Sequence, residues 1–120
     1  MKRVIIVDDS VAVSRQLEKI ICSCDGFEVI AQGRNGAEAI KLAQQKKPDI
    51  LRMDMNMPVM DGLTALRNLR QIAPQIAVVL ITSLGGVGDK YTEALKLGAK
   101  DVISKPFDQE NVMKVLRKID

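Results

Sequence analysis

Short apolar runs recur along the chain and alternate with longer stretches in which apolar residues have helical spacing. The runs predict strands at residues 3–8, 27–31, 49–54, 77–82 and 101–104. In the first run the apolar residues are continuous rather than alternating with polar ones, a pattern typical of strands buried on both faces of a parallel sheet.

Between these runs, apolar residues three and four positions apart predict amphipathic helices. Asp9 and Ser10 can cap the first helix, Asn35-Gly36 opens the second, and Asp61-Gly62 starts the third. The fourth and fifth helices are predicted over residues 89–97 and 109–118. The positions predicted to face the core are Val13, Leu17, Ile20, Ile21, Cys24, Ala39, Ile40, Ala43, Leu66, Leu69, Ile72, Val112, Val115, Leu116 and Ile119. Alternating strands and helices predict an α/β fold with right-handed crossovers.

Length and composition are those of one globular domain, which we assign to residues 1–120. The net charge is +3, but the basic residues are scattered and aromatic residues make up only 2% of the chain, which disfavours direct nucleic-acid binding. No apolar run approaches the length of a membrane span. Cys22 and Cys24, two positions apart on a helix, point in different directions, so we expect unpaired thiols, as in a reducing cytoplasm.

Polar residues that can carry chemistry follow four of the five predicted strands. Asp8 and Asp9 end the first run, Asp54 the third, Thr82 the fourth and Lys105 the fifth. Taken singly, the first two are more simply helix caps and the others ordinary strand-end residues. Because the carboxyl ends of parallel strands share one edge, where open α/β sheets bind ligands, the coincidence predicts a common pocket.

Three carboxylates at one edge repel each other, and a bound proton or a bound cation relieves the repulsion. The chain contains no histidine, and an all-oxygen ligand set suits a hard cation, Mg²⁺ above all. A carboxylate beside Mg²⁺ can act as a nucleophile toward phosphorus and form an aspartyl phosphate. Lys105 and Thr82 could then bind the phosphoryl oxygens.

The joint pattern resembles the receiver domain of two-component response regulators, over the whole chain. The motifs that carry the resemblance are Asp8-Asp9, residues 54–62, Thr82-Ser83 and Lys105-Pro106-Phe107. The chain is most similar to single-domain chemotaxis regulators of the CheY type. The resemblance implies a flavodoxin-like (βα)5 doubly wound sandwich whose five-stranded parallel sheet has the order 2-1-3-4-5.

The resemblance also implies roles for individual residues. Asp54 would accept the phosphoryl group from a phosphohistidine on a CheA-like sensor histidine kinase. Mg²⁺ would be held by Asp9, Asp54 and the backbone carbonyl of Asn56, with Asp8 nearby or acting through a water molecule. The remaining implied roles are phosphoryl binding and switching by Thr82, Ser83 and Lys105, and a cis peptide at Pro106.

As for partners, the resemblance implies an output protein, such as the flagellar motor switch protein, bound at the face made by the fourth helix, fifth strand and fifth helix. A phosphatase is a further possible partner; nucleic acid and membrane are not expected. The chain would be a cytoplasmic monomer that can dimerise when phosphorylated. It would be a phosphoacceptor that assists its own phosphorylation and slow dephosphorylation, rather than a turnover enzyme.

Two residues depart from the family pattern. Val102 stands three residues before Lys105, where the family usually has an aromatic residue, so we expect switching through Thr82 and the glycine-rich segment 83–88 instead. Arg52 lies two residues before Asp54 on a predicted interior strand. Its side chain could snorkel outward or reach toward the acidic edge, and the sequence leaves both open.

The same residues suggest three alternative assignments. A hydrolase of the haloacid dehalogenase type needs an acid two residues after its nucleophile, where this chain has Asn56. A flavin carrier needs a phosphate-binding loop after the first strand, where Asp8 and Asp9 would repel phosphate. The third, a receiver cut from a larger regulator with a DNA-binding or methylesterase domain, stays open.

Overall fold

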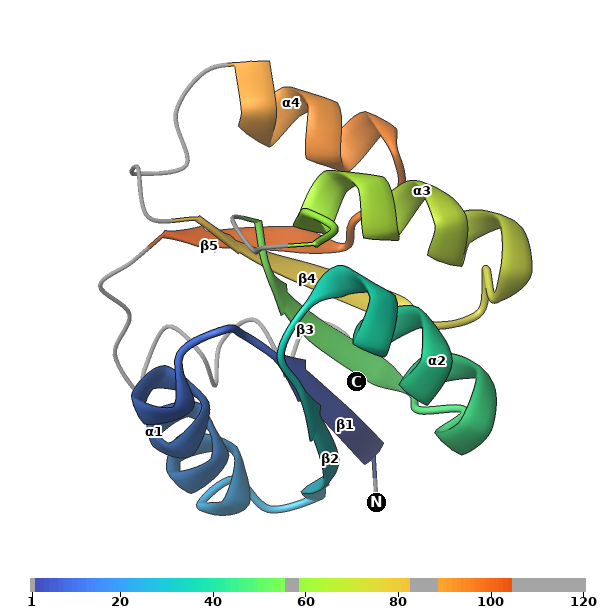
Figure 1. The fold of residues 1–120 in the computed structure, drawn as a ribbon. Coiled ribbons are helices and arrows are strands. Elements are labelled where there is room, and N and C mark those ends of the chain that lie inside the picture. Colours follow the sequence, from blue (N-terminus) through green and yellow to red (C-terminus); the bar gives the residue numbers. More distant parts are fainter. Residues whose placement is uncertain (1, 56–58, 83–88, 105–120) are drawn as a thin grey trace.

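The computed structural model describes residues 2–55, 59–82 and 89–104. Five strands form one parallel sheet in the order β2-β1-β3-β4-β5 (Figure 1), which confirms the predicted order. The strands are β1 (Lys2–Val7), β2 (Phe27–Gly33), β3 (Ile50–Asp54), β4 (Ala77–Thr82) and β5 (Asp101–Ser104). The predicted strands are confirmed within one or two residues at their ends.

Helices connect the parallel strands and cover both faces of the sheet. They are α1 (Val11–Cys22), α2 (Gly36–Lys46), α3 (Gly62–Ile72) and α4 (Asp89–Lys96). Helix α1 lies on one side of the sheet, and α2, α3 and α4 lie on the other (Figure 1). The predicted fifth helix, with its inward positions Val112, Val115, Leu116 and Ile119, falls outside the described residues.

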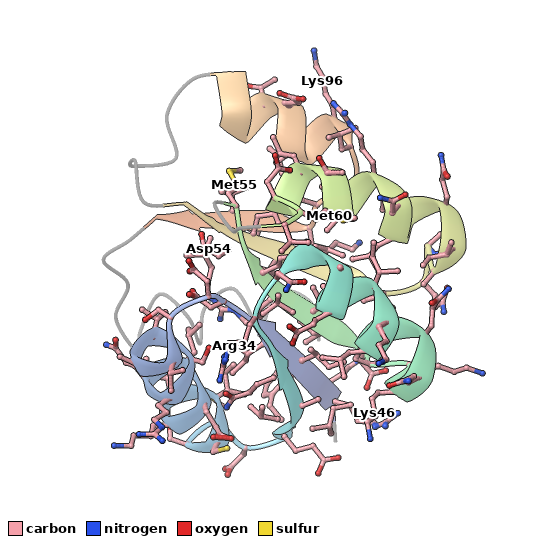
Figure 2. All side chains as sticks on the ribbon, viewed as in Figure 1. Arg34, Lys46, Asp54, Met55, Met60 and Lys96 are labelled. Atoms are coloured by element: carbon pink, nitrogen blue, oxygen red, sulfur yellow. The ribbon has the colours of Figure 1, made fainter. Side chains whose placement is uncertain are left out.

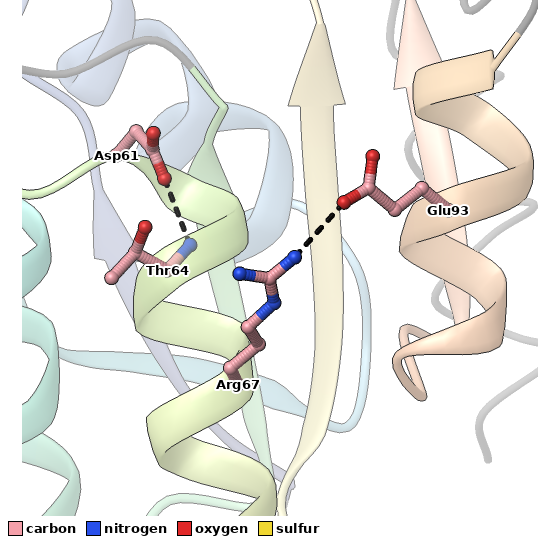
Figure 3. A network of polar contacts seen from close by, with 4 residues as sticks. All are labelled: Asp61, Thr64, Arg67 and Glu93. Atoms are coloured by element: carbon pink, nitrogen blue, oxygen red, sulfur yellow. Dashed lines mark hydrogen bonds and ion pairs between the residues drawn. The ribbon is translucent and has the colours of Figure 1, made fainter.

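The starts of the first three helices follow from their capping side chains. The Ser10 hydroxyl accepts from the Val13 N–H at 3.3 Å, and the Asn35 side chain accepts from the Glu38 N–H at 2.9 Å. Asp61 accepts from the Thr64 N–H at 2.8 Å (Figure 3). Each bond satisfies a backbone N–H that has no acceptor inside its own helix.

Helices α3 and α4 are joined by an ion pair between Arg67 and Glu93, whose closest N–O distance is 3.1 Å (Figure 3). Both side chains are about half exposed, so the pair contributes little to stability. After α4 the chain turns at Gly98, which has φ 105°, a left-handed conformation that favours glycine. The predicted stop of this helix at Gly98 is confirmed.

Among the described residues, the core consists of two clusters, one on each face of the sheet. In β1, Ile5 and Val7 belong to the cluster under α2 and α3, whereas Val4 and Ile6 belong to the cluster under α1. Alternate residues of a strand point to opposite faces. Both sets are buried, and this explains why the strand sequences are continuously apolar.

Most positions predicted to face the core are buried or partly buried. Ile72 is an exception, because its side chain is 46% exposed. It lies in the last turn of α3 at the margin of the apolar stripe, and Ala73 takes the inward position there instead. Cys22 is exposed and Cys24 is buried, and the two form no disulfide with each other, as predicted. None of the described helices is long and apolar enough to cross a membrane.

Candidate functional site

Three carboxylates gather at the carboxyl edge of the sheet. Strands β1 and β3 are parallel neighbours with Val7 paired to Met53, so the residues that follow, Asp8 and Asp54, lie at the same level. Asp8, Asp9 and Asp54 each place one carboxylate oxygen within 4.8 Å of the other two. This is the point where the strand order reverses, and such switch points are the usual ligand sites of open α/β sheets.

The turn between β1 and α1 gives the first two acids different surroundings. Asp8 is fully buried, and its Oδ1 accepts the Ser10 N–H at 2.8 Å. Its own N–H donates to the Gly33 carbonyl at 3.1 Å. Ser10 caps the helix, which leaves Asp9 exposed to solvent. Asp8 is therefore fixed in place, and Asp9 lies where a cation from solvent would reach it first.

Asp54 is the last residue of β3 and is only 4% exposed. Just after it, the Met55 N–H donates to the Ile81 carbonyl, and the Gly62 N–H donates to the Met55 carbonyl, both at 2.9 Å. A Cβ atom on Gly62 would lie 2.5 Å from the Asp54 carbonyl oxygen, so only glycine allows this close approach. Hydrogen bonds to β4 and to the start of α3 thus fix the backbone next to Asp54.

The backbone of β4 and β5 extends the same edge. Asp54 pairs with Ile81, so Thr82, the last residue of β4, lies one position beyond Asp54 on the neighbouring strand. The predicted place of Thr82 at this edge is therefore confirmed. Val102 is buried in β5 opposite Leu80. The other predicted site residues, Asn56, Ser83, Lys105 and Pro106, lie outside the described residues.

The three acids fit a hexacoordinate hard cation. Mg²⁺ holds oxygen ligands at about 2.1 Å in octahedral geometry, which places opposite ligands about 4 Å apart. A cluster within 4.8 Å accommodates such an ion with little adjustment, particularly if one carboxylate acts through a water molecule. When bound, the ion would supply positive charge for phosphate oxygens, and Asp9 and Asp54 would hold it with Asp8 close by.

Arg34 also lies near this edge, and the sequence reasoning missed it. Its Nη1 donates to the Asp8 carbonyl at 3.3 Å and to the Ser14 hydroxyl at 2.9 Å. Figure 2 shows Arg34 between α1 and the sheet, below Asp54. It directly follows β2, so the rule that placed acids at strand ends could have found it.

Arg52 takes neither of the two courses that the sequence left open. Its side chain is 0% exposed, so it does not snorkel to the surface. Its three side-chain nitrogens have no hydrogen-bond partner in residues 2–55, 59–82 and 89–104, and it forms no ion pair with an acid of the edge there. It pairs with Ile6 and Val79 on the neighbouring strands. Burial lowers the pKa of its guanidinium to about 10.

The fold and the acidic edge define a class of protein: a doubly wound, five-stranded α/β domain with a cluster of carboxylates at its switch point that could hold a cation. The family model of the response regulator receiver domain matches residues 4–117. The chain therefore belongs to the response regulator receiver family, whose members generally depend on Mg²⁺.

Similar proteins include both single-domain and multidomain regulators. The chemotaxis protein CheY of Bacillus subtilis is 39% identical over 116 residues, which cover 97% of this chain and 95% of that protein. A protein-glutamate methylesterase/protein-glutamine glutaminase of Caldanaerobacter subterraneus is 48% identical over 105 residues. The match covers 87% of this chain but only 28% of that enzyme.

Solved structures agree with this assignment. The response regulator domain of Thermotoga maritima CheB superposes with a TM-score of 0.88 at 34% identity, covering 99% of this chain and 93% of that one. CheY in a CheX-CheY-BeF3-Mg²⁺ complex from Borrelia burgdorferi has a TM-score of 0.90 at 35% identity. That match covers 98% of this chain and 88% of the other.

Proposed function

We propose that this protein is a phosphorylation-dependent signalling switch of a two-component system, in which Asp54 accepts a phosphoryl group in the presence of Mg²⁺. The observation that carries the proposal is the gathering of Asp8, Asp9 and Asp54 within 4.8 Å at the switch point of the sheet. A buried carboxylate among other carboxylates, in a site that fits a cation, is suited to attack phosphorus rather than to pair with a neighbouring base.

In the proposed reaction, a carboxylate oxygen of Asp54 attacks the phosphorus of a phosphohistidine. The new O–P bond forms as the P–N bond breaks, and the leaving imidazole takes up a proton. Asp8, fixed by its bond from the Ser10 N–H, and Asp9, open to solvent, would hold the cation with Asp54, and the cation would supply positive charge for the phosphoryl oxygens. Thr82, Ser83 and Lys105 are proposed to bind the phosphoryl oxygens in the product.

We assign switching rather than turnover to this site. Asn56 stands two residues after Asp54, and its amide cannot serve as a general base for hydrolysis of the phosphorylated carboxylate. Loss of the phosphoryl group would therefore be slow unless a phosphatase assists. Rapid multiple-turnover hydrolysis of a phosphoryl donor by the pure protein would contradict this assignment.

Receiver domains interact with kinases and with output proteins, and the CheY relatives support a role in chemotaxis. The proposed donor is a CheA-like histidine kinase, and the proposed target is a flagellar motor switch protein or another output protein. A phosphatase is a further proposed partner, and the Borrelia structure, in which CheY is in a complex with CheX, shows that a similar protein binds a second protein. We propose a cytoplasmic protein that is monomeric until phosphorylation.

The experiment that tests the phosphoacceptor is mass spectrometry after incubation with acetyl phosphate and Mg²⁺. The parent protein should gain one phosphoryl group on Asp54, and Asp54→Asn should gain none. Asp25→Asn, at an exposed turn, is the matched control and should be labelled like the parent. Stoichiometric labelling of Asp54→Asn would overturn the assignment.

A second candidate is the receiver portion of a methylesterase regulator. The 48% identity to the Caldanaerobacter enzyme favours it, and this chain matches only 28% of that protein. An antibody against this chain, applied to extracts of cells that encode it, distinguishes the two. A band near 13.2 kDa supports the single-domain switch, whereas a band several times larger supports the methylesterase regulator.

A further inference from the structure

We propose that Arg34 is a positioning residue for the metal-binding acids: it fixes the turn that carries Asp8 and Asp9 without contacting the cation itself. The inference rests on the proposed Mg²⁺ site. The observation behind this inference is that one guanidinium bonds to three separate parts of the chain. In Figure 2, Arg34 lies below Asp54, between α1 and the sheet.

The contacts of the Arg34 side chain come from β2, from the end of β1 and from α1. Its Nη1 donates to the Ser14 hydroxyl at 2.9 Å, to the Asp8 carbonyl at 3.3 Å and to the Gly33 carbonyl at 3.4 Å. Its Nη2 donates to the Gln32 side-chain oxygen at 3.2 Å. Ser14 is fully buried, so this partner has little freedom to move. Arg34, which follows β2, therefore links the two ends of the segment from Asp8 to Ser14.

These four acceptors are all neutral. The neighbouring carboxylate of Glu38 accepts the backbone N–H of Arg34 at 3.1 Å, but it forms no ion pair with the guanidinium. These partners therefore do not neutralise the positive charge of the guanidinium. Its planar fork of donors sets the geometry of the contacts. It can affect a nearby cation in two opposite ways, by shaping the site or by repelling positive charge.

The same connection between β2 and α2 also holds the chain that follows Asp54. The Gly36 N–H donates to the Met60 carbonyl at 3.1 Å, and a Cβ atom on Gly36 would lie 2.6 Å from that oxygen. Residues 34–36 thus bond to both acid-bearing connections, the Asp8 turn through Arg34 and the segment after Asp54 through Gly36. The spacing between the acids depends on this bridge.

Removing the Arg34 fork should free the turn and let the acids move apart. Loss of a residue that orients metal ligands typically weakens metal binding about 10- to 100-fold. We expect Arg34→Met to bind Mg²⁺ about tenfold more weakly than the parent. If the guanidinium acted only through its charge, the same substitution would instead strengthen Mg²⁺ binding, so the sign of the change separates the two roles.

The test is a calorimetric titration of the purified chain with Mg²⁺, using Arg34→Met, Arg34→Lys and Ser14→Ala. Lysine keeps the charge but not the planar fork, so Arg34→Lys should also bind weakly. Ser14→Ala removes the shortest contact and should weaken binding in the same direction, less than additively with Arg34→Met, because the two residues share one contact. Arg67→Met, an exposed arginine on α3, is the matched control and should bind like the parent.

The outcomes distinguish this inference from the proposed function. A parent protein that does not bind Mg²⁺ would refute the proposed metal site itself. A parent that binds Mg²⁺, together with an Arg34→Met or Arg34→Lys variant that binds equally well or better, would overturn the positioning role alone. If Arg34→Met does not fold by circular dichroism, the comparison of Arg34→Lys and Ser14→Ala with the parent decides the question.

Discussion

Replacing the buried Arg52 by methionine should make the protein more stable. Arg52 lies on the central strand β3, where it pairs with Ile6 and Val79, and its side chain is fully buried with no hydrogen-bond partner among the described residues. Methionine has a similarly long, unbranched side chain that adapts to irregular space, and it carries no charge. Arg52→Met therefore removes a buried cation that has no hydrogen-bond partner in the described part of the chain, with little loss of packing.

The size of the effect follows from the pKa of Arg52, which burial lowers to about 10. That is roughly two pKa units below the ordinary value of arginine, and one unit corresponds to about 1.4 kcal/mol, so burying the charged form costs about 3 kcal/mol relative to the unfolded chain. Because the folded-state pKa is the lower one, this cost is fully present at pH 7 and is relieved only as the pH rises above about 10 toward the ordinary pKa of arginine. We expect Arg52→Met to raise the free energy of unfolding at pH 7 by about 3 kcal/mol.

Urea unfolding followed by far-ultraviolet circular dichroism measures the change, since the chain has no tryptophan. The midpoint of thermal unfolding should rise as well, by on the order of 10 °C for a chain of this size. Arg52→Lys retains a buried charge and should not gain this stability. Arg15→Met, at an exposed position of α1, is the matched control and should change the free energy of unfolding by less than about 0.5 kcal/mol.

An Arg52→Met protein that is as stable as the parent, or less stable, would refute this reasoning. It would mean that the guanidinium is compensated in the folded protein by a partner outside the described residues. An equal gain in Arg15→Met would also count against it, because the effect would then not come from burial.

Three further predictions concern the acidic edge and its neighbours. Asp9→Ala should weaken Mg²⁺ binding more than Asp8→Ala in a calorimetric titration; equal affinity of Asp9→Ala and the parent would exclude Asp9 as a ligand. Val59 is 83% exposed with φ 70°, a left-handed conformation that is unfavourable for a β-branched residue. Val59→Gly should therefore raise the free energy of unfolding by up to about 1 kcal/mol, seen as a higher midpoint of urea unfolding, and a lower midpoint would contradict this. Beryllofluoride should change amide hydrogen exchange in residues 83–90 and leave the rotamer of the buried Val102 unchanged, whereas exchange changes confined to β5 would disprove a switch through that segment.

Much of the fold could be predicted from local sequence signals. The five apolar runs predicted the five strands, and Ser10, Asn35 and Asp61 cap the helices as expected from their short polar side chains. These signals act between residues that are close in the chain, so they can be recognised from the sequence alone. The strand order came from the resemblance to receiver domains, because periodicity alone does not say which strands are neighbours.

The acids at the site were also predictable, because parallel strands place their carboxyl ends along one edge. The sequence could not predict that the acids differ in burial and in hydrogen bonding. Asp8 is buried and holds the Ser10 N–H, whereas its neighbour Asp9 faces solvent. That difference depends on the path of one turn, which is set by contacts with Gly33 and Arg34 from a different strand.

Tertiary structure alone decided the cases in which distant segments meet. The Arg52 side chain is long enough to reach the surface or the acidic edge, but it is fully buried and its nitrogens bond to no acid among the described residues. Ile72 fits the helical stripe, yet it lies beyond the covered part of α3. The sequence by itself thus determined the elements and the residues at their ends, through local spacing. Burial and contact partners depend on packing across the sheet, which no local pattern encodes.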